Sequence, residues 1–193
     1  MERIRKLMKE VGYDALLITS PWNMKYFSGF SGGEGFLFIT LEDAFLATDF
    51  RYALLAKKEC KDLKIIEYKN NRYEVLVKKF KNINPIIGIE NKFMTIQDLR
   101  SLEDSVPELK WKPLDNFLDE FRQIKTEKEV SYIKKAESIG DTAFEKVLNH
   151  IRPGMTELEV VAYLEFYMKT SGAEALSFET IAASGENTVI PHA

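Results

Sequence analysis

Short apolar runs alternate with longer segments of helical spacing over about the first 110 residues, and this alternation limits the possible folds more than any other feature. The clearest runs, at residues 15–19, 36–40, 44–48 and 85–90, each predict a strand, and the run at residues 15–19 has the continuous apolar character of a strand buried on both faces. Strands and helices in alternation pack as a sheet covered by helices. We therefore predict an α/β domain with a mixed sheet, ending near Arg122.

Individual elements follow from the same patterns. The turn-type residues 41–43 separate two of the apolar runs, which predicts a β-hairpin and hence the antiparallel part of the mixed sheet. Ser20, Pro21 and Asn23 are expected to end the strand at residues 15–19. Weaker patterns predict further strands at residues 64–68 and 109–111, and helices at residues 2–10, 51–58, 72–80 and 95–103.

A second domain is predicted from the change of pattern near Thr126. Residues 126–129 and 156–159 both read Thr-Glu-x-Glu, the capping box that begins a helix, and the two helices should end near Asn149 and before Gly172. After them we expect a short strand at residues 178–183, a turn, and a second extended run that ends at the chain's last residues. Two helices and so little sheet predict an incomplete α+β domain over residues 123–193.

Composition excludes several classes of function. The net charge is −3, from 27 basic and 30 acidic residues, and there is no basic block, so we expect no nucleic-acid partner. No apolar run approaches the roughly 20 residues of a membrane-spanning helix. The single cysteine, Cys60, excludes an internal disulfide and CxxC-type metal sites. These features predict a reduced, cytoplasmic protein without a membrane partner.

The common catalytic motifs are missing from the sequence. The glycine-rich segment at residues 29–35 lacks the lysine of a phosphate-binding loop, so its glycines are better explained by tight backbone turns. There is no HExxH sequence, no paired histidine spacing and no GxSxG nucleophile motif. We locate no metal site, and we interpret His150, at the end of a helix, as structural.

Two residues are candidates for a site. Arg51 follows an apolar run directly after Asp49, and its planar guanidinium can either pair with that carboxylate or bind the carboxylate of a substrate. His192 follows Pro191, whose fixed φ stiffens the backbone, so its imidazole can be held in a cleft. The alternative for His192 is an ordinary polar residue near a frayed chain end.

Several stretches resemble one enzyme family. Residues 151–160 (IRPGMTELEV), 172–174 (GAE) and 177–193 (SFETIAASGENTVIPHA) resemble the early catalytic domain of the pita-bread metallopeptidases, and most closely the Xaa-Pro aminopeptidases and Xaa-Pro dipeptidases (prolidases). Residues 121–136 resemble the linker and first long helix of these enzymes. Residues 23–40 and 47–52 resemble their creatinase-like N-terminal domain. The resemblance covers nearly the whole chain in order, and the choice between aminopeptidase and dipeptidase stays open.

This resemblance implies a creatinase-like domain at residues 1–122 and the beginning of a pita-bread domain at residues 123–193. Members of the family hydrolyse the bond before a proline with two divalent ions, usually manganese or cobalt, which make a bridging water nucleophilic. Their five metal ligands follow the Pro-His-Ala sequence, so the resemblance implies that this chain binds no metal and is inactive alone as the N-terminal portion of a longer enzyme. His192 matches a catalytic histidine that is not a metal ligand but binds substrate or assists proton transfer.

The resemblance also implies partners. They are proline-containing peptides and further copies of the same chain, as a homodimer or a higher oligomer. In the family the N-terminal domain narrows the entrance to the active site, and Arg51 and residues 29–35 are our candidates for that wall. Two alternatives remain open. One is a non-catalytic module of the same fold that binds peptides or histones, and the other is a creatinase-like amidinohydrolase acting on a small guanidino substrate.

Overall fold

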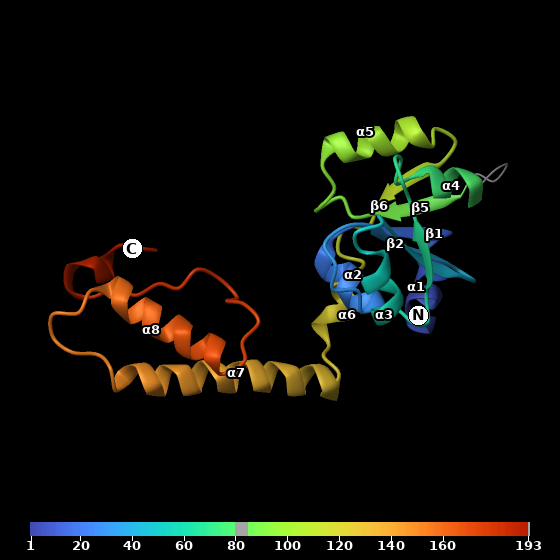
Figure 1. Cartoon of the computed structure of the whole chain (residues 1–193). Helices are drawn as coiled ribbons and strands as arrows, with labels where there is room; N and C mark the ends of the chain where they lie inside the picture. The colour runs from blue at the N-terminus through green and yellow to red at the C-terminus, as the bar shows by residue number, and fades with distance from the viewer. Residues whose placement is uncertain (80–84, 193) are drawn as a thin grey trace. The chain divides into compact units, whose positions relative to one another are not determined.

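A six-stranded mixed sheet forms the centre of the first part of the chain in the computed structural model, which describes residues 1–79 and 85–192 (Figure 1). The strands lie in the order β4-β3-β2-β1-β5-β6. The strands β1, β2 and β3 pair antiparallel, and the pairs β3–β4, β1–β5 and β5–β6 are parallel. Their bounds are β1 Ala15–Ile18, β2 Phe36–Thr40, β3 Ala44–Thr48, β4 Lys64–Glu67, β5 Ile86–Ile89 and β6 Lys110–Pro113. The predicted α/β fold with a mixed sheet and a hairpin is confirmed.

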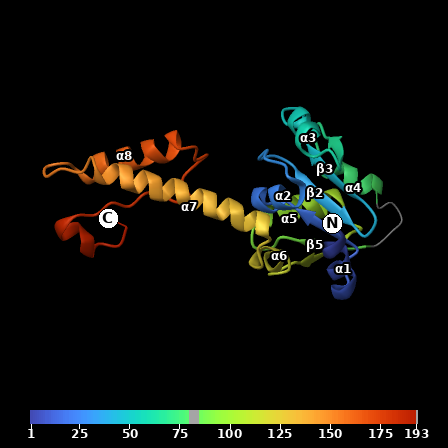
Figure 2. The ribbon, with the colours of Figure 1, turned by 90° about the horizontal axis from the view of Figure 1, so that it is seen from below.

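Helices cover both faces of this sheet (Figures 1 and 2). One face carries α1 (Glu2–Val11), α2 (Pro21–Ser28), α3 (Ala53–Glu59) and α6 (Asp119–Gln123), and the other carries α4 (Glu74–Lys79) and α5 (Ile96–Ser105). Successive side chains of a strand point to opposite faces, so Leu16 packs into the first core and Leu17 into the second. Every residue of β1 is buried, as a central strand between two helical layers requires.

The helices α1, α3 and α5 lie within two residues of the predicted segments, and α4 begins two residues after its predicted start. The helix predicted at residues 72–80 is α4, which begins at Glu74, and the predicted end at Phe80 lies outside the described residues. As predicted, β1 ends before Ser20, Pro21 and Asn23, and the chain then forms a helix, α2, that was not predicted. It begins at Pro21, where the fixed φ of proline suits the first helical position, and it ends at Gly29 with φ 79°.

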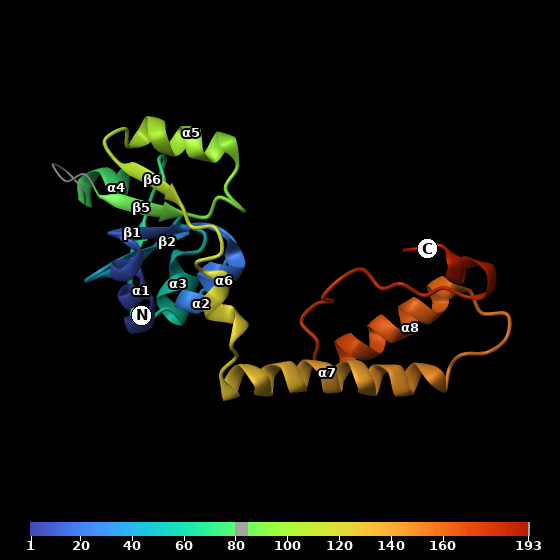
Figure 3. The same ribbon diagram turned by 180° about the vertical axis from the view of Figure 1, so that it is seen from behind.

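Residues 123–193 form a second compact unit, separate from the unit of residues 1–122. It contains α7 (Glu127–Leu148), α8 (Glu157–Thr170) and the 3₁₀ helix η1 (Gly185–Val189), and α7 and α8 pack against each other (Figure 3). Both predicted capping boxes are present: the Thr126 hydroxyl accepts from Glu129 N, and the Thr156 hydroxyl accepts from Glu159 N. Among the described residues, no helix is both long and apolar enough to cross a membrane.

The strand predicted at residues 178–183 is wrong, and so is the extended run after it. None of the described residues of this unit forms a strand, so an extended segment would have no partner for its backbone hydrogen bonds. The chain turns instead into η1, which the Glu157 carboxylate holds: its Oε1 accepts from Ser184 N and its Oε2 from Asn187 Nδ2 at 3.0 Å. The second unit is therefore helical within the described residues.

Candidate functional site

The polar groups of the first unit gather at one edge of its sheet. Thr19 follows β1 and Glu90 follows β5, at the carboxyl ends of two neighbouring parallel strands. The loop of residues 29–35 leads into β2 at the same edge, because β2 runs antiparallel to β1. In open α/β sheets this edge is where ligands bind.

The carboxylate of Glu90 is the most buried acidic group at this edge, with a residue exposure of 6 %. Its Oε2 accepts from Thr19 N at 2.6 Å and from Ser20 N at 2.8 Å, and its Oε1 accepts from Ser20 Oγ at 2.6 Å and from Asn23 Nδ2 at 2.7 Å. A buried carboxylate is stable only when such donors replace water. Both oxygens are fully engaged, so Glu90 fastens the start of α2 to the end of β5.

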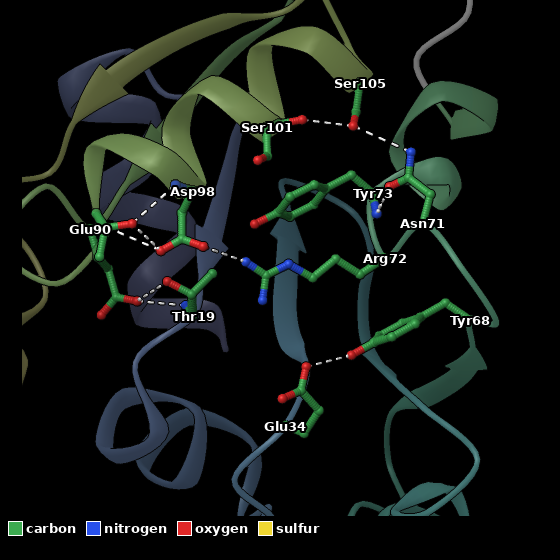
Figure 4. A network of polar contacts seen from close by, with 11 residues as sticks. Thr19, Glu34, Tyr68, Asn71, Arg72, Tyr73, Glu90, Asp98, Ser101 and Ser105 are labelled. Atoms are coloured by element: carbon green, nitrogen blue, oxygen red, sulfur yellow. Dashed lines mark hydrogen bonds and ion pairs between the residues drawn. The ribbon is translucent and has the colours of Figure 1, made fainter.

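A second polar network lies beside Glu90 (Figure 4). Arg72 Nη2 donates to Asp98 Oδ1 at 3.0 Å, and Tyr68 Oη donates to Glu34 Oε1 at 2.9 Å. Asp98 also closes the capping box of α5, where its Oδ2 accepts from Thr95 Oγ1 at 2.6 Å. The bond from Thr95 is the main reason that the pKa of Asp98 lies below its ordinary value. The network thus joins α5, the segment before α4 and the loop before β2.

Residues 29–35 form a fixed loop. Ser31 donates to the Glu59 carboxylate of α3 from both N, at 2.8 Å, and Oγ, at 2.7 Å. Gly35 has φ 131°, and a Cβ there would lie 2.2 Å from Ala47 O. Only glycine allows this approach, so a tight backbone turn accounts for the glycine at this position.

Arg51 lies just beyond β3 and is engaged with Asp49. Arg51 N donates to Asp49 Oδ1 at 2.9 Å, and Arg51 Nε donates to Asp49 Oδ2 at 2.9 Å. The bond from Arg51 is the largest reason that the pKa of Asp49 is lowered. The Arg51 side chain is nevertheless 58 % exposed, so an incoming carboxylate can reach it. The predicted pairing with Asp49 is present, and the substrate-binding role stays a prediction.

His192 belongs to the second unit, after η1. It is exposed, its φ is 58°, and none of the interactions between described residues involves its ring. The left-handed φ differs from the extended conformation expected for this run. The other histidine, His150, contacts Lys146 O and Tyr167 Oη, and its ring lies 4.9 Å from that of Tyr163, as its structural interpretation predicts. Arg51 lies in the first unit and His192 in the second.

The described residues do not supply a metal centre. No group of three or more His, Cys, Asp or Glu side chains among residues 1–79 and 85–192 is arranged to hold an ion. No catalytic step through a metal follows from these residues.

Comparison with known proteins places both units. The Creatinase/Prolidase N-terminal domain family matches residues 1–124, and Metallopeptidase family M24 matches residues 131–193. This chain belongs to the creatinase/prolidase family. The family resemblance drawn from the sequence is thereby confirmed, and the second match is to a metal-dependent peptidase family.

Three relatives within this family illustrate the similarity. A Xaa-Pro dipeptidase of Pyrococcus furiosus is 32% identical over all of this chain and 54% of its own length. The structure of a Xaa-Pro dipeptidase from Bacillus anthracis has a TM-score of 0.92 at 33% identity, over 99% of this chain and 54% of that one. An X-Pro aminopeptidase structure from Thermotoga maritima has a TM-score of 0.85 at 34% identity, over 100% of this chain and 55% of that one. The chain spans about half the length of the curated relatives it matches.

Sequence reasoning missed the two networks at the sheet edge. Two sequence signals pointed to these networks. Glu90 is an acidic residue at the end of a buried strand, and Asp98 stands three residues after Thr95, the spacing of a helix cap. Their donors could not be read, because Thr19 and Arg72 are distant in sequence and only the sheet topology brings them close.

Proposed function

We propose that this chain is part of a metal-dependent peptidase that hydrolyses the peptide bond before a proline. The observation that carries the proposal is the match of both units, in order, to the creatinase/prolidase and M24 families. Close relatives in structure are named as a Xaa-Pro dipeptidase and an X-Pro aminopeptidase, so the proposal covers both substrate types.

Within this enzyme we propose His192 as a catalytic residue that contacts substrate or assists proton transfer. Its support is its place in the Pro-His-Ala sequence, which resembles the family motif. The imidazole of His192 is exposed, and an imidazole can both accept and donate a proton. We propose Arg51 as a substrate-binding residue on the wall of the entrance, since its guanidinium is exposed although paired with Asp49.

We further propose that the second unit is covered in the working enzyme, by more of the peptidase domain or by another copy of the chain. The supporting observation is its exposed apolar surface: Leu158, Phe178 and Val189 are 77%, 79% and 82% exposed. Leaving several large apolar side chains in water is unfavourable, which favours a surface that covers them. Light scattering of the purified protein at several concentrations measures whether copies associate.

The decisive experiment is a peptidase assay with manganese and a Xaa-Pro dipeptide, on this chain and on a chain extended past Ala193. The five ligands of the family follow the Pro-His-Ala sequence, so we expect turnover only in the extended chain. His192→Ala there should lower kcat by about 10²-fold or more, the usual contribution of a proton-transfer group, while metal content stays unchanged. Arg51→Ala should raise KM, and Arg100→Ala, on the exposed side of α5, is its control.

Three results would contradict the proposal. Turnover by the 193 residues above a metal-only blank would show that the chemistry does not depend on later ligands. An extension without two aspartates, a histidine and two glutamates would instead favour the peptide-binding module. Hydrolysis of creatine but of no Xaa-Pro peptide would favour the amidinohydrolase.

A further inference from the structure

A cavity of about 220 Å³ opens among the groups of the second polar network, entirely within the first unit. Thr19, Glu34, Arg72, Tyr73 and Asp98 line it, together with apolar groups of Pro21, Phe93 and Met94. It lies at the carboxyl edge of β1 and β5, where open α/β sheets bind ligands. Neither His192 nor Arg51 lines this cavity.

The hydroxyl of Tyr73, which lines this cavity, is a buried polar group without a hydrogen-bond partner in the described residues, and a bound ligand could supply one. Tyr73 is only 2% exposed, and its Oη has no hydrogen-bond partner among the described residues. Leaving a buried hydroxyl without a partner is costly, and such groups are rare in folded proteins. Burial raises the pKa of this hydroxyl, so it is a protonated donor at neutral pH. Figure 4 shows the Tyr73 hydroxyl on the same side as the Arg72 guanidinium and the Asp98 carboxylate.

Arg72 adds positive donors to the same space. Its Nη2 donates to Asp98 Oδ1, and a guanidinium carries further N–H donors besides this one. The Arg72 Cζ lies 4.8 Å from the centre of the Tyr73 ring, so the guanidinium and the phenol are neighbours. Together they offer two kinds of donor to one acceptor group, and a carboxylate suits a guanidinium best because its two oxygens match the planar fork.

Glu34 supplies the opposite charge. Its Oε1 accepts from Tyr68, and its Oε2 has no partner among the described residues. Since Asp98 already offsets the charge of Arg72, the Glu34 carboxylate leaves the cavity with an excess negative charge. A ligand that places a carboxylate on Arg72 must therefore also carry a cation to balance Glu34.

The volume limits the size of the ligand. A cavity of about 220 Å³ corresponds to about seven water volumes, room for about six to eight non-hydrogen atoms. We propose that the cavity binds a small free α-amino acid, its carboxylate on Arg72 and Tyr73 and its ammonium on Glu34. Alanine and proline have the required charges and size, and Pro21 and Phe93 offer an apolar wall to their side chains.

The test is a titration of the ¹⁵N-labelled 193-residue chain with L-alanine and L-proline, followed by amide NMR shifts. We expect saturable shifts at Gly33, Gly35 and Tyr73 with a Kd in the millimolar range, as suits a ligand of so few atoms. Two analogues each lack one charge: N-acetylalanine lacks the ammonium, and alaninamide lacks the carboxylate. Each should bind at least roughly tenfold more weakly than alanine, because one charged contact is lost. These comparisons use the unaltered chain and need no hydrolytic activity.

Two variants assign the contacts. Tyr73→Phe removes only the unpartnered hydroxyl, so the fold keeps all its bonds and alanine binding should weaken roughly tenfold. Arg72→Gln should weaken it at least as much, whereas Tyr132→Phe in the second unit and Arg100→Gln should leave it unchanged. The proposal fails if alanine causes no localised shifts at roughly 50 mM, far above the expected range. It also fails if alaninamide and N-acetylalanine bind as well as alanine, or if both cavity variants bind alanine normally.

Discussion

The helices α5 and α8 begin in the same way and end in different surroundings. Each starts with a threonine whose hydroxyl accepts from the third residue's N–H, in a complete capping box. On α5, Leu102 is fully buried against the sheet, whereas α8 has no buried residue and its Leu158 is 77% exposed. A cap therefore fixes where a helix begins, and the presence of a sheet decides what the helix buries.

The largest expected difference concerns the buried network of the first unit. Glu90→Ala leaves Ser20, Asn23 and two backbone N–H groups without their acceptor. We expect a loss of about 3–5 kcal/mol in the free energy of unfolding, because each buried donor left without an acceptor costs about 1–3 kcal/mol. Urea unfolding followed by Trp fluorescence measures it, with the exposed Glu103→Ala on α5 as the control. Equal midpoints for the two variants would show that the network contributes nothing.

Truncating one leucine in each unit compares the two environments directly. Leu17→Ala removes a fully buried side chain from the sheet and should cost about 2–5 kcal/mol. Leu158→Ala removes an exposed side chain and should change stability by less than about 0.5 kcal/mol. A large loss for Leu158→Ala in the purified chain would mean that another surface covers α8 in solution.

The glycine turn of the first unit offers a matched pair. Gly35→Ala places a Cβ against Ala47 O at a φ of 131°, and we expect it to cost about 2–3 kcal/mol through strain and crowding. Gly33→Ala, two residues earlier, meets nothing within 4 Å and should be neutral. Thermal unfolding of both variants checks the pair, and a neutral Gly35→Ala would show that the loop can rearrange.

Removing the capping threonine should disturb the helix of the second unit more than the helix of the first. Thr95→Ala and Thr156→Ala each lose one capping bond, worth about 1 kcal/mol. Because α5 is also held by the sheet, Thr95→Ala should lower stability without loss of helix. Because none of its residues is fully buried, α8 should lose helical content, visible by circular dichroism. Equal loss of helix in both variants would remove this distinction.

The same distinction explains what the sequence could and could not predict. The apolar run at residues 15–19 predicted a buried central strand, because burial on both faces leaves a local record in composition. The apolar run at residues 178–183 looked similar but forms no strand, since a strand needs a partner that local sequence does not reveal. The site followed the same rule. The pairing of Arg51 with Asp49 could be predicted because the two residues are close in sequence. The pairs Arg72–Asp98 and Glu90–Thr19 could not, because only the sheet topology brings them together.

The smallest expected effect is a dependence of the first unit's stability on pH. The pKa of Asp98 is lowered, first by its bond with Thr95 and further by Arg72. A lowered pKa means that folding favours the ionised form, so the stabilisation is complete above the ordinary carboxyl pKa near 3.9 and is lost as pH falls through the folded value. Asp98→Asn should therefore flatten the fall in unfolding free energy below about pH 4, and Asp104→Asn on the same helix should not. An identical acid limb in both variants would show that the bonds of Asp98 do not stabilise the first unit.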